Sequence, residues 1–224
     1  MNLKIFKLAA SKSIIFRMGL WISLLSPSFV MSKTRPGVCV FGGSFDPPHL
    51  GHIEVAEKMA SSTDCEHLYI VAKNGFLAEK PNRTNWHYRM EMLKAVFKEH
   101  KNISVPNVDI YATIESIRKS GKLVVGITGS DRALNPTHEY EKMQVDRWVV
   151  CTRIADEAKP EVLNMTKFLG KPVLVRSFKE HGNSSTAVRK HIRKNLPIEG
   201  AALHPRVISF IKQHNLYGFK GKKL

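Results

Sequence analysis

The stretch VCVFGGSFDPPHLGH, residues 38–52, decides the fold that we expect of this chain. It begins with an apolar run typical of a buried strand, and Gly42 and Gly43 then let the backbone turn and lie close to a ligand. His49 and His52 follow three residues apart, a spacing that places both side chains on one face of a helix. The free N–H groups and the dipole at the start of such a helix attract anions. The stretch therefore predicts a strand, a phosphate-binding turn and a helix.

Outward from this stretch, short apolar runs alternate with longer amphipathic segments. We expect strands in 38–43, 67–72, 122–131, 146–153 and 171–178, an extended segment at 103–111, and helices in 50–61, 85–100, 113–121, 184–196 and 204–218. This alternation predicts an α/β fold, a Rossmann-like doubly wound parallel sheet in one domain. Ligands of such sheets bind beyond the carboxyl ends of the strands, which would bring the turns at 42–52, 129–131 and 183–189 together.

The formal net charge of +16 is concentrated at the ends of the chain. Residues 1–36 carry six Lys or Arg and no acid, and the basic tail 220–224 carries three more Lys. Removing these nine cations leaves +7 for the body, 37–219. An excess of this size suits a polyphosphate ligand as well as it suits DNA.

Residues 1–36 are interpreted as an N-terminal extension outside the fold, either a targeting segment or the result of a true start at Met31. The uninterrupted apolar run, 19–25, is far shorter than the ~20 residues that cross a bilayer, so we expect no membrane span. We expect a cytoplasmic protein, with organellar or secretory targeting by residues 1–30 left open.

Cys39, Cys65 and Cys151 are far apart in the sequence and form no CxxC pair. This odd number at wide spacing indicates neither a zinc ribbon nor a disulfide framework. We therefore expect three buried free thiols in a reducing compartment.

Two motifs resemble the signatures of the nucleotidyltransferase superfamily that has an HxGH motif. GGSFDPPHLGH, 42–52, resembles GxFDPxHxGH, and SSTAVRK, 184–190, resembles ISSTxxR. The resemblance covers roughly residues 38–218 and implies that 37–219 is a single nucleotidyltransferase domain. It implies that a phosphate of an acceptor attacks the α-phosphate of ATP and pyrophosphate leaves, without a covalent enzyme intermediate. Catalysis of this kind relies on positioning and electrostatics.

The family pattern also implies roles for individual residues. His49 and His52 hold the ATP phosphates near the reacting phosphorus, and Arg189 binds the β- and γ-phosphates as a third catalytic residue. The other predicted ATP ligands are Gly42, Gly43, Ser44, Phe45, Gly129, Asp131, Ser185 and Thr186. Mg²⁺ is expected to arrive with ATP, with no metal ligand from the protein itself. The less specific interpretation of the second motif is a helix cap followed by a solvated basic face.

The acceptor is indicated by the C-terminal segment HPRVISFIKQHNLY, 204–217, which resembles the closing helix of nicotinate or nicotinamide mononucleotide adenylyltransferases. The resemblance implies NAD biosynthesis, with ATP and a pyridine mononucleotide as partners. Trp86 and Arg89 are the expected mononucleotide ligands, with Trp86 stacking on the pyridine ring or, alternatively, packing in the core. Tyr140 is the other candidate for the stacking role. The choice between the acid and the amide mononucleotide stays open.

Two other functions stay open at this point. A phosphopantetheine adenylyltransferase, or another nucleotidyltransferase, would share both motifs. A basic nucleic-acid-binding protein would explain the net charge, but the sequence carries no RRM, KH or helix-turn-helix signature, so we expect no specific nucleic-acid partner. Formation of a homo-oligomer is left open.

Overall fold

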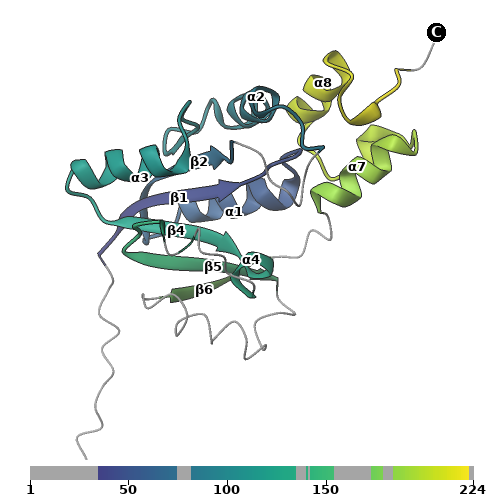
Figure 1. Ribbon diagram of the computed structural model, residues 1–224. Coiled ribbons are helices and arrows are strands. Elements are labelled where there is room, and N and C mark those ends of the chain that lie inside the picture. Colours follow the sequence, from purple (N-terminus) through teal and green to yellow (C-terminus); the bar gives the residue numbers. More distant parts are fainter. Residues whose placement is uncertain are drawn as a thin grey trace, which may run out of the picture. The chain divides into compact units, whose positions relative to one another are not determined.

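A parallel sheet of six strands, in the order β3-β2-β1-β4-β5-β6, forms the centre of the computed structural model (Figure 1). The structure describes residues 35–74, 82–134, 140, 142–153, 173–178 and 184–221, all within the compact unit Thr34–Leu224. The strands are β1 Gly37–Gly43, β2 Cys65–Ala72, β3 Ile103–Ser104, β4 Val124–Gly129, β5 Arg147–Arg153 and β6 Val173–Phe178. This sheet confirms the predicted doubly wound α/β fold.

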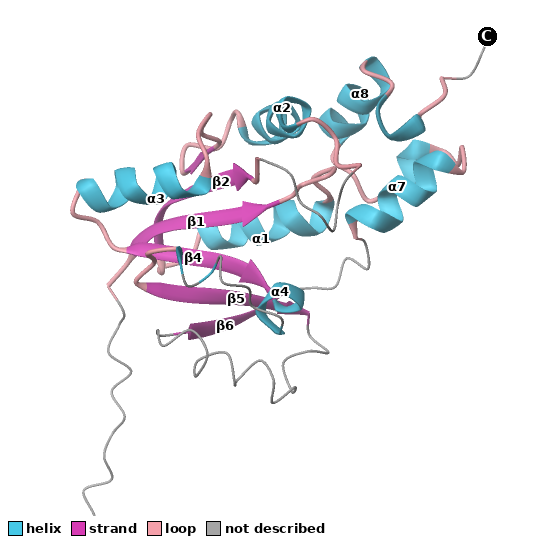
Figure 2. Ribbon diagram, in the orientation of Figure 1, coloured by secondary structure: helices cyan, strands magenta, loops and turns pink. Residues whose placement is uncertain are grey.

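Helices cover both faces of the sheet (Figure 2). They are α1 Leu50–Ala60, α2 Trp86–Phe97, α3 Ile110–Lys119, α4 Ser130–Leu134, α7 Ser185–Arg193 and α8 Pro205–Gln213, with 3₁₀ turns η2 Ile198–Gly200 and η3 Leu216–Gly218. Side chains of a strand alternate between the faces. Cys39 and Phe41 of β1 therefore pack in the core that includes α1, α2, α7 and α8, whereas Val38 and Val40 pack in the core that includes α3.

The strand order reverses at β1, which lies between β2 and β4. In Figure 1 the arrowheads of β1 and β4 point toward the side where α7 and α4 lie. Open sheets of this kind bind ligands outside the carboxyl ends of the strands at the reversal point. The topology therefore directs attention to the loop after β1, the turn after β4 and the start of α7, which we call the carboxyl edge.

Several predicted element boundaries differ from the structure, and two of them have a clear local cause. The strand predicted at 122–131, for example, is Val124–Gly129, and residues 130–131 begin α4. Helix α3 begins at Ile110, not at 113, because the Asp109 side chain accepts a hydrogen bond from the backbone N–H of Ala112 at 2.8 Å and caps it. The extended segment is thus reduced to the two residues of β3. Helix α8 ends at Gln213 rather than 218, because Asn215 adopts a left-handed conformation with φ of 47° that an α-helix does not accommodate.

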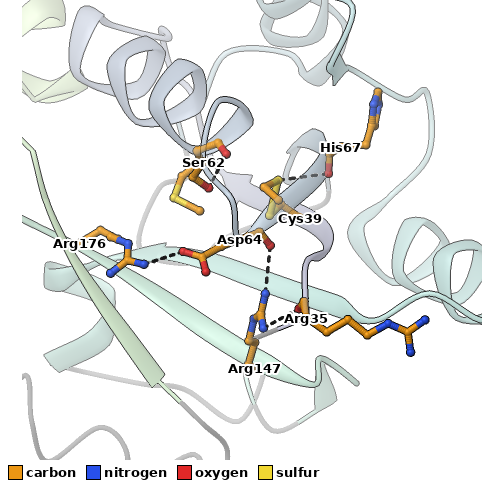
Figure 3. Close-up of a disulfide and its surroundings, with 9 residues drawn as sticks. Arg35, Cys39, Ser62, Asp64, His67, Arg147 and Arg176 are labelled. Atoms are coloured by element: carbon orange, nitrogen blue, oxygen red, sulfur yellow. Dashed lines mark hydrogen bonds and ion pairs between the residues drawn. A yellow bond between two sulfur atoms is a disulfide. The ribbon is translucent and has the colours of Figure 1, made fainter. Parts of the chain in front are cut away.

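The expectation of three free cysteines is wrong for two of them. Cys39 of β1 and Cys65 of β2 form a disulfide, with Cα atoms 5.6 Å apart (Figure 3). They are separated by 26 residues in the chain, and only the pairing of β1 with β2 makes them neighbours. Cys151 is free and buried, and burial raises the pKa of its thiol to about 12.

Charged side chains fix the amino-terminal ends of the strands, which we call the amino edge (Figure 3). The buried Arg147 donates to the carbonyl oxygens of Arg35 at 2.9 Å and Asp64 at 3.0 Å. The buried Asp64 carboxylate accepts a bond of 2.7 Å from Arg176 of β6. These contacts join the beginnings of β1, β2 and β5 to β6.

Helices in the described part of the chain are all too short or too polar to cross a membrane.

Candidate active site

The loop after β1 folds back over the end of its own strand. Phe45 adopts φ of 47°, a conformation that residues other than glycine rarely adopt, and the residue is 1% exposed. A Cβ atom on Gly43 would lie 2.8 Å from that ring, so glycine is required there. Because the whole residue is buried in the core, this conformation does not support the predicted contact of Phe45 with ATP.

His49 and His52 lie together at the start of α1, as their spacing predicts. Their rings are stacked with centroids 3.7 Å apart, and the Phe45 ring meets His52 edge-on at 5.0 Å. The backbone N–H of His49 donates to Nδ1 of His52 at 3.3 Å. Since a backbone N–H can only donate, Nδ1 of His52 is the acceptor, and the neutral ring then carries its proton on Nε2. Nε2 is thus a donor suited to a phosphate oxygen.

Gly51 leaves room for this pair of rings. A Cβ atom at this position would lie 3.2 Å from the His49 ring, closer than ordinary van der Waals contact. The position of the His49 ring therefore explains, on steric grounds, why residue 51 is a glycine.

The second motif meets the first one across more than 130 residues of sequence. Ser184 caps α7 by accepting from the N–H of Ala187 at 3.1 Å. Ser185 Oγ donates to the carbonyl oxygen of Pro47 at 2.9 Å, and Arg189 Nη1 donates to that of Asp46 at 2.6 Å. The structure thus brings the start of α7 directly against the loop that precedes His49.

Thr186 completes the described geometry of the second motif. Its hydroxyl oxygen accepts from Arg189 Nη2 at 3.2 Å. Two of the five N–H groups of the Arg189 guanidinium are therefore used within the protein, and three can serve an anionic ligand.

Arg89 lies beneath the loop and is 1% exposed. It donates to three backbone carbonyl oxygens, those of Ser44 at 2.5 Å, Thr84 at 2.8 Å and Lys73 at 2.9 Å. Burial, followed by the nearby Arg83 cation, lowers the pKa of Arg89 to about 10, against the opposing effects of Asp46 and Tyr217. This placement gives Arg89 a role in holding the loop and does not support its predicted contact with the mononucleotide.

Hydrogen bonds of their polar atoms place Trp86 near the end of β2 and Tyr140 near the end of β4. Trp86 Nε1 donates to the carbonyl oxygen of Ala72, the last residue of β2, at 2.9 Å. The Tyr140 hydroxyl and Thr128 Oγ1 of β4 are 2.8 Å apart, and the Tyr140 ring lies against Trp148 with centroids 5.0 Å apart. Stacking of either ring on a pyridine stays a prediction.

The turn after β4 is only partly described. Gly129 ends β4 in an open position, since a Cβ atom there would have no neighbour within 4 Å. Asp131 follows in the short helix α4, and its side chain lies outside the described residues. Their predicted contacts with ATP are untested by this geometry.

Sequence reasoning missed two residues of this site. Asp46 lies between the glycines and the histidines of the first motif and is 4% exposed, and its Oδ1 accepts from the Tyr217 hydroxyl at 2.9 Å. A buried acid inside a motif otherwise suited to anions was a usable signal, because such an acid needs donors nearby. Nothing in the sequence indicated that one of those donors is Tyr217, 171 residues away.

The described residues hold no cluster of three or more His, Cys, Asp or Glu side chains that could hold a metal ion. Mg²⁺ in nucleotide sites is bound mainly by substrate phosphates and water, with few protein ligands. The described side chains of the carboxyl edge, dominated by histidine and arginine donors, therefore fit a metal that arrives on ATP.

Sequence comparison matches this chain to a family model and to curated relatives. A model of the cytidylyltransferase-like family matches residues 40–191. A probable nicotinate-nucleotide adenylyltransferase of Gemmatimonas aurantiaca is 29% identical over 197 residues, which cover 80% of this chain and 90% of that protein. The probable nicotinate-nucleotide adenylyltransferase of Carboxydothermus hydrogenoformans is 25% identical over 194 residues, or 80% of this chain and 96% of the relative.

Solved structures share the fold. Those of the Plasmodium falciparum nicotinic acid mononucleotide adenylyltransferase, complexed with APC and with NaAD, match with TM-scores of 0.65 and 0.66 at 20% identity. Each match covers 83% of this chain and 98% of the solved chain.

Proposed function

The chain belongs to the cytidylyltransferase-like family, and from this premise we propose that it joins ATP to nicotinate mononucleotide in NAD biosynthesis. The products are the dinucleotide and pyrophosphate. One structural observation carries the proposal: Ser185 and Arg189 of the second motif hydrogen-bond to the loop that leads into His49 and His52. The reaction is inferred from the names of the relatives, which match along four fifths of this chain.

The reaction requires no group on the protein to form a bond. An oxygen of the mononucleotide phosphate attacks the α-phosphorus of ATP, the bond from that phosphorus to the bridging oxygen breaks, and pyrophosphate takes the electron pair. Negative charge therefore grows on the leaving phosphates. Fixed donors directed at such charge are the largest source of rate enhancement in reactions of this type.

The two motifs would divide this task. His52, with its proton on Nε2, and His49 would donate to oxygens near the α-phosphorus. Arg189 would bind the β- and γ-phosphates at the start of α7, together with Ser185 and Thr186. Mg²⁺ bound to ATP would neutralise further charge on the same phosphates.

Pyrophosphate release from ATP and Mg²⁺ tests this function, with nicotinate mononucleotide, nicotinamide mononucleotide and phosphopantetheine offered separately to the full chain. We expect turnover with the pyridine mononucleotides and a preference for the acid. Turnover with phosphopantetheine alone would reassign the acceptor. No pyrophosphate release with any of the three acceptors would contradict the proposal. Salt-dependent binding of DNA or RNA by such an inactive chain would favour the nucleic-acid-binding alternative.

A further inference from the structure

The Asp46 carboxylate connects the first motif to three separate segments of the chain. Its Oδ1 accepts from the Tyr217 hydroxyl at 2.9 Å, and its Oδ2 accepts from the backbone N–H of Thr84 at 3.3 Å. Arg189 Nη1 lies 3.9 Å from Oδ2 and donates to the Asp46 carbonyl oxygen at 2.6 Å. One residue thus links Arg189, the predicted phosphate ligand, to the loop that precedes both histidines.

Tyr217 reaches Asp46 through an unusual backbone. Asn215, Tyr217 and Gly218 all have positive φ values, of 47°, 60° and 77°. For a residue other than glycine this conformation is unfavourable, so favourable contacts must hold Tyr217 there. Burial and then the Asp46 charge raise the pKa of the Tyr217 hydroxyl well above its usual value. The hydroxyl therefore stays protonated and remains a donor at any working pH.

Arg89 and Thr84 hold the other side of the same loop. The backbone N–H of Thr84 donates to Asp46 Oδ2. Arg89 donates from Nε to the carbonyl oxygen of Thr84 and from Nη1 to that of Ser44. The backbone before Asp46 is thus fixed by Arg89, whereas the Asp46 side chain is oriented by Tyr217 and Thr84. Without the Tyr217 hydroxyl, Oδ1 of Asp46 would lose this donor, and the carboxylate could turn toward Arg189.

We propose that Tyr217 and Asp46 are positioning residues that set the direction of the Arg189 guanidinium and thereby the affinity of the site for the triphosphate of ATP. The proposal rests on the proposed function for its substrate, and it deepens that function by assigning the C-terminal segment a part in phosphate binding. Neither residue touches the reacting atoms. A carboxylate free to pair fully with Arg189 would compete with the phosphates for the same donors.

The first test is Tyr217→Phe, which removes the hydroxyl and keeps the ring. Tyr88→Phe is the matched control, because Tyr88 is also partly buried and packs against α8 at Phe210. Dissociation constants for ATP and for tripolyphosphate are measured by calorimetry without any acceptor, together with KM for ATP, KM for the mononucleotide and Tm. We expect both dissociation constants and the KM for ATP to rise about tenfold, which is the order of effect expected when one hydrogen bond to a charged group is lost. The KM for the mononucleotide and all values of Tyr88→Phe should stay unchanged, whereas the Tm of Tyr217→Phe should fall by only a few degrees, because the buried Asp46 carboxylate loses one donor.

A second variant, Asp46→Asn, keeps the shape of the side chain but offers only one acceptor oxygen to its donors. We expect weaker tripolyphosphate binding in the same direction, and a double variant with Tyr217→Phe whose effect is smaller than the sum of the two. Unchanged tripolyphosphate binding in Tyr217→Phe would overturn the proposal. An equal loss in all kinetic constants, with no selective effect on ATP and tripolyphosphate, would also overturn it, since that pattern is expected of a merely structural contact.

The proposed function can fail separately in this design. A wild-type chain that binds tripolyphosphate, loses it in Tyr217→Phe and turns over no pyridine mononucleotide would contradict the function and support the positioning role. A wild-type chain that binds neither ATP nor tripolyphosphate would overturn both.

Discussion

Arg89 and Arg147 are both buried and both donate to backbone carbonyl groups, but they lie at opposite edges of one sheet. At the carboxyl edge, Arg89 holds carbonyl groups of Ser44, Lys73 and Thr84. At the amino edge, Arg147 holds those of Arg35 and Asp64.

The difference lies in what else fixes each backbone. The beginnings of β1 and β2 at the amino edge are also held by strand pairing, in which Gly37 lies opposite Cys65. The loop that contains Phe45 and Asp46 lies beyond the last paired residues of β1 and depends on side-chain donors for its conformation. Loops of this kind carry function because a rigid scaffold holds them. Similar arginines thus support stability at one edge and the geometry of the site at the other.

The largest expected effect comes from replacing one histidine at each edge of the sheet by alanine. His52→Ala should lower the rate of pyrophosphate release by about 10²- to 10³-fold, because removing one preorganised donor has effects of this size. His67→Ala, a change near the start of β2, should leave that rate within a factor of about two, as expected of a residue far from the reacting atoms. Steady-state rates and circular dichroism of both variants are the measurements. Comparable losses in the two would break the distinction between the edges.

The second expected effect compares the arginines themselves. Arg89→Met and Arg147→Met should each lower the free energy of unfolding by about 2–4 kcal/mol, because each removes a buried cation that donates to two or more backbone carbonyl groups. Only Arg89→Met should also lower kcat/KM for ATP in the folded protein. Urea unfolding and kinetics at low temperature measure the two quantities, and Arg→Lys at each position serves if a Met variant does not fold. An equal loss of kcat/KM in both variants would speak against the comparison.

The smallest expected effect is a pH dependence of stability near the amino edge. Burial lowers the pKa of His67, whose Nε2 lies 2.9 Å from Ser104 Oγ, below its ordinary value. The unfolded chain then takes up this proton at a higher pH than the folded chain does. The stability contributed by neutral His67 is thus present above about pH 6.5 and lost as the pH falls through the lower folded value.

His67→Gln should accordingly flatten the fall in unfolding free energy between pH 7 and pH 5, measured in urea, with no change of turnover at pH 7.5. An identical slope in the wild-type chain and the variant would remove His67 as the cause.

Much of the fold and the core of the site could be predicted from local patterns. The glycine turn, the two histidines and the SSTAVRK helix start each act over a few residues, and their spacing is fixed by helix geometry. Asp109 shows the limit of this reasoning, because its capping bond moved the start of α3 back by three residues against the apparent extended pattern. Arg89 shows another limit, since the same residue type serves as a ligand or as a buried donor depending on what lies above it.

The sequence alone determined the order of strands and helices and predicted a phosphate site after the first strand. These two features depend on periodicity, on the conformational freedom of glycine and on free N–H groups at helix starts, which are properties of short segments. The reaction was implied by the resemblance of the two motifs to a known family. The tertiary structure alone decided that Cys39 meets Cys65, that Arg189 donates to the Asp46 carbonyl, and that Tyr217 donates to the Asp46 carboxylate. Each of these contacts joins segments far apart in the chain. Their distances follow from how strands pair and helices pack around one core, which no local pattern contains.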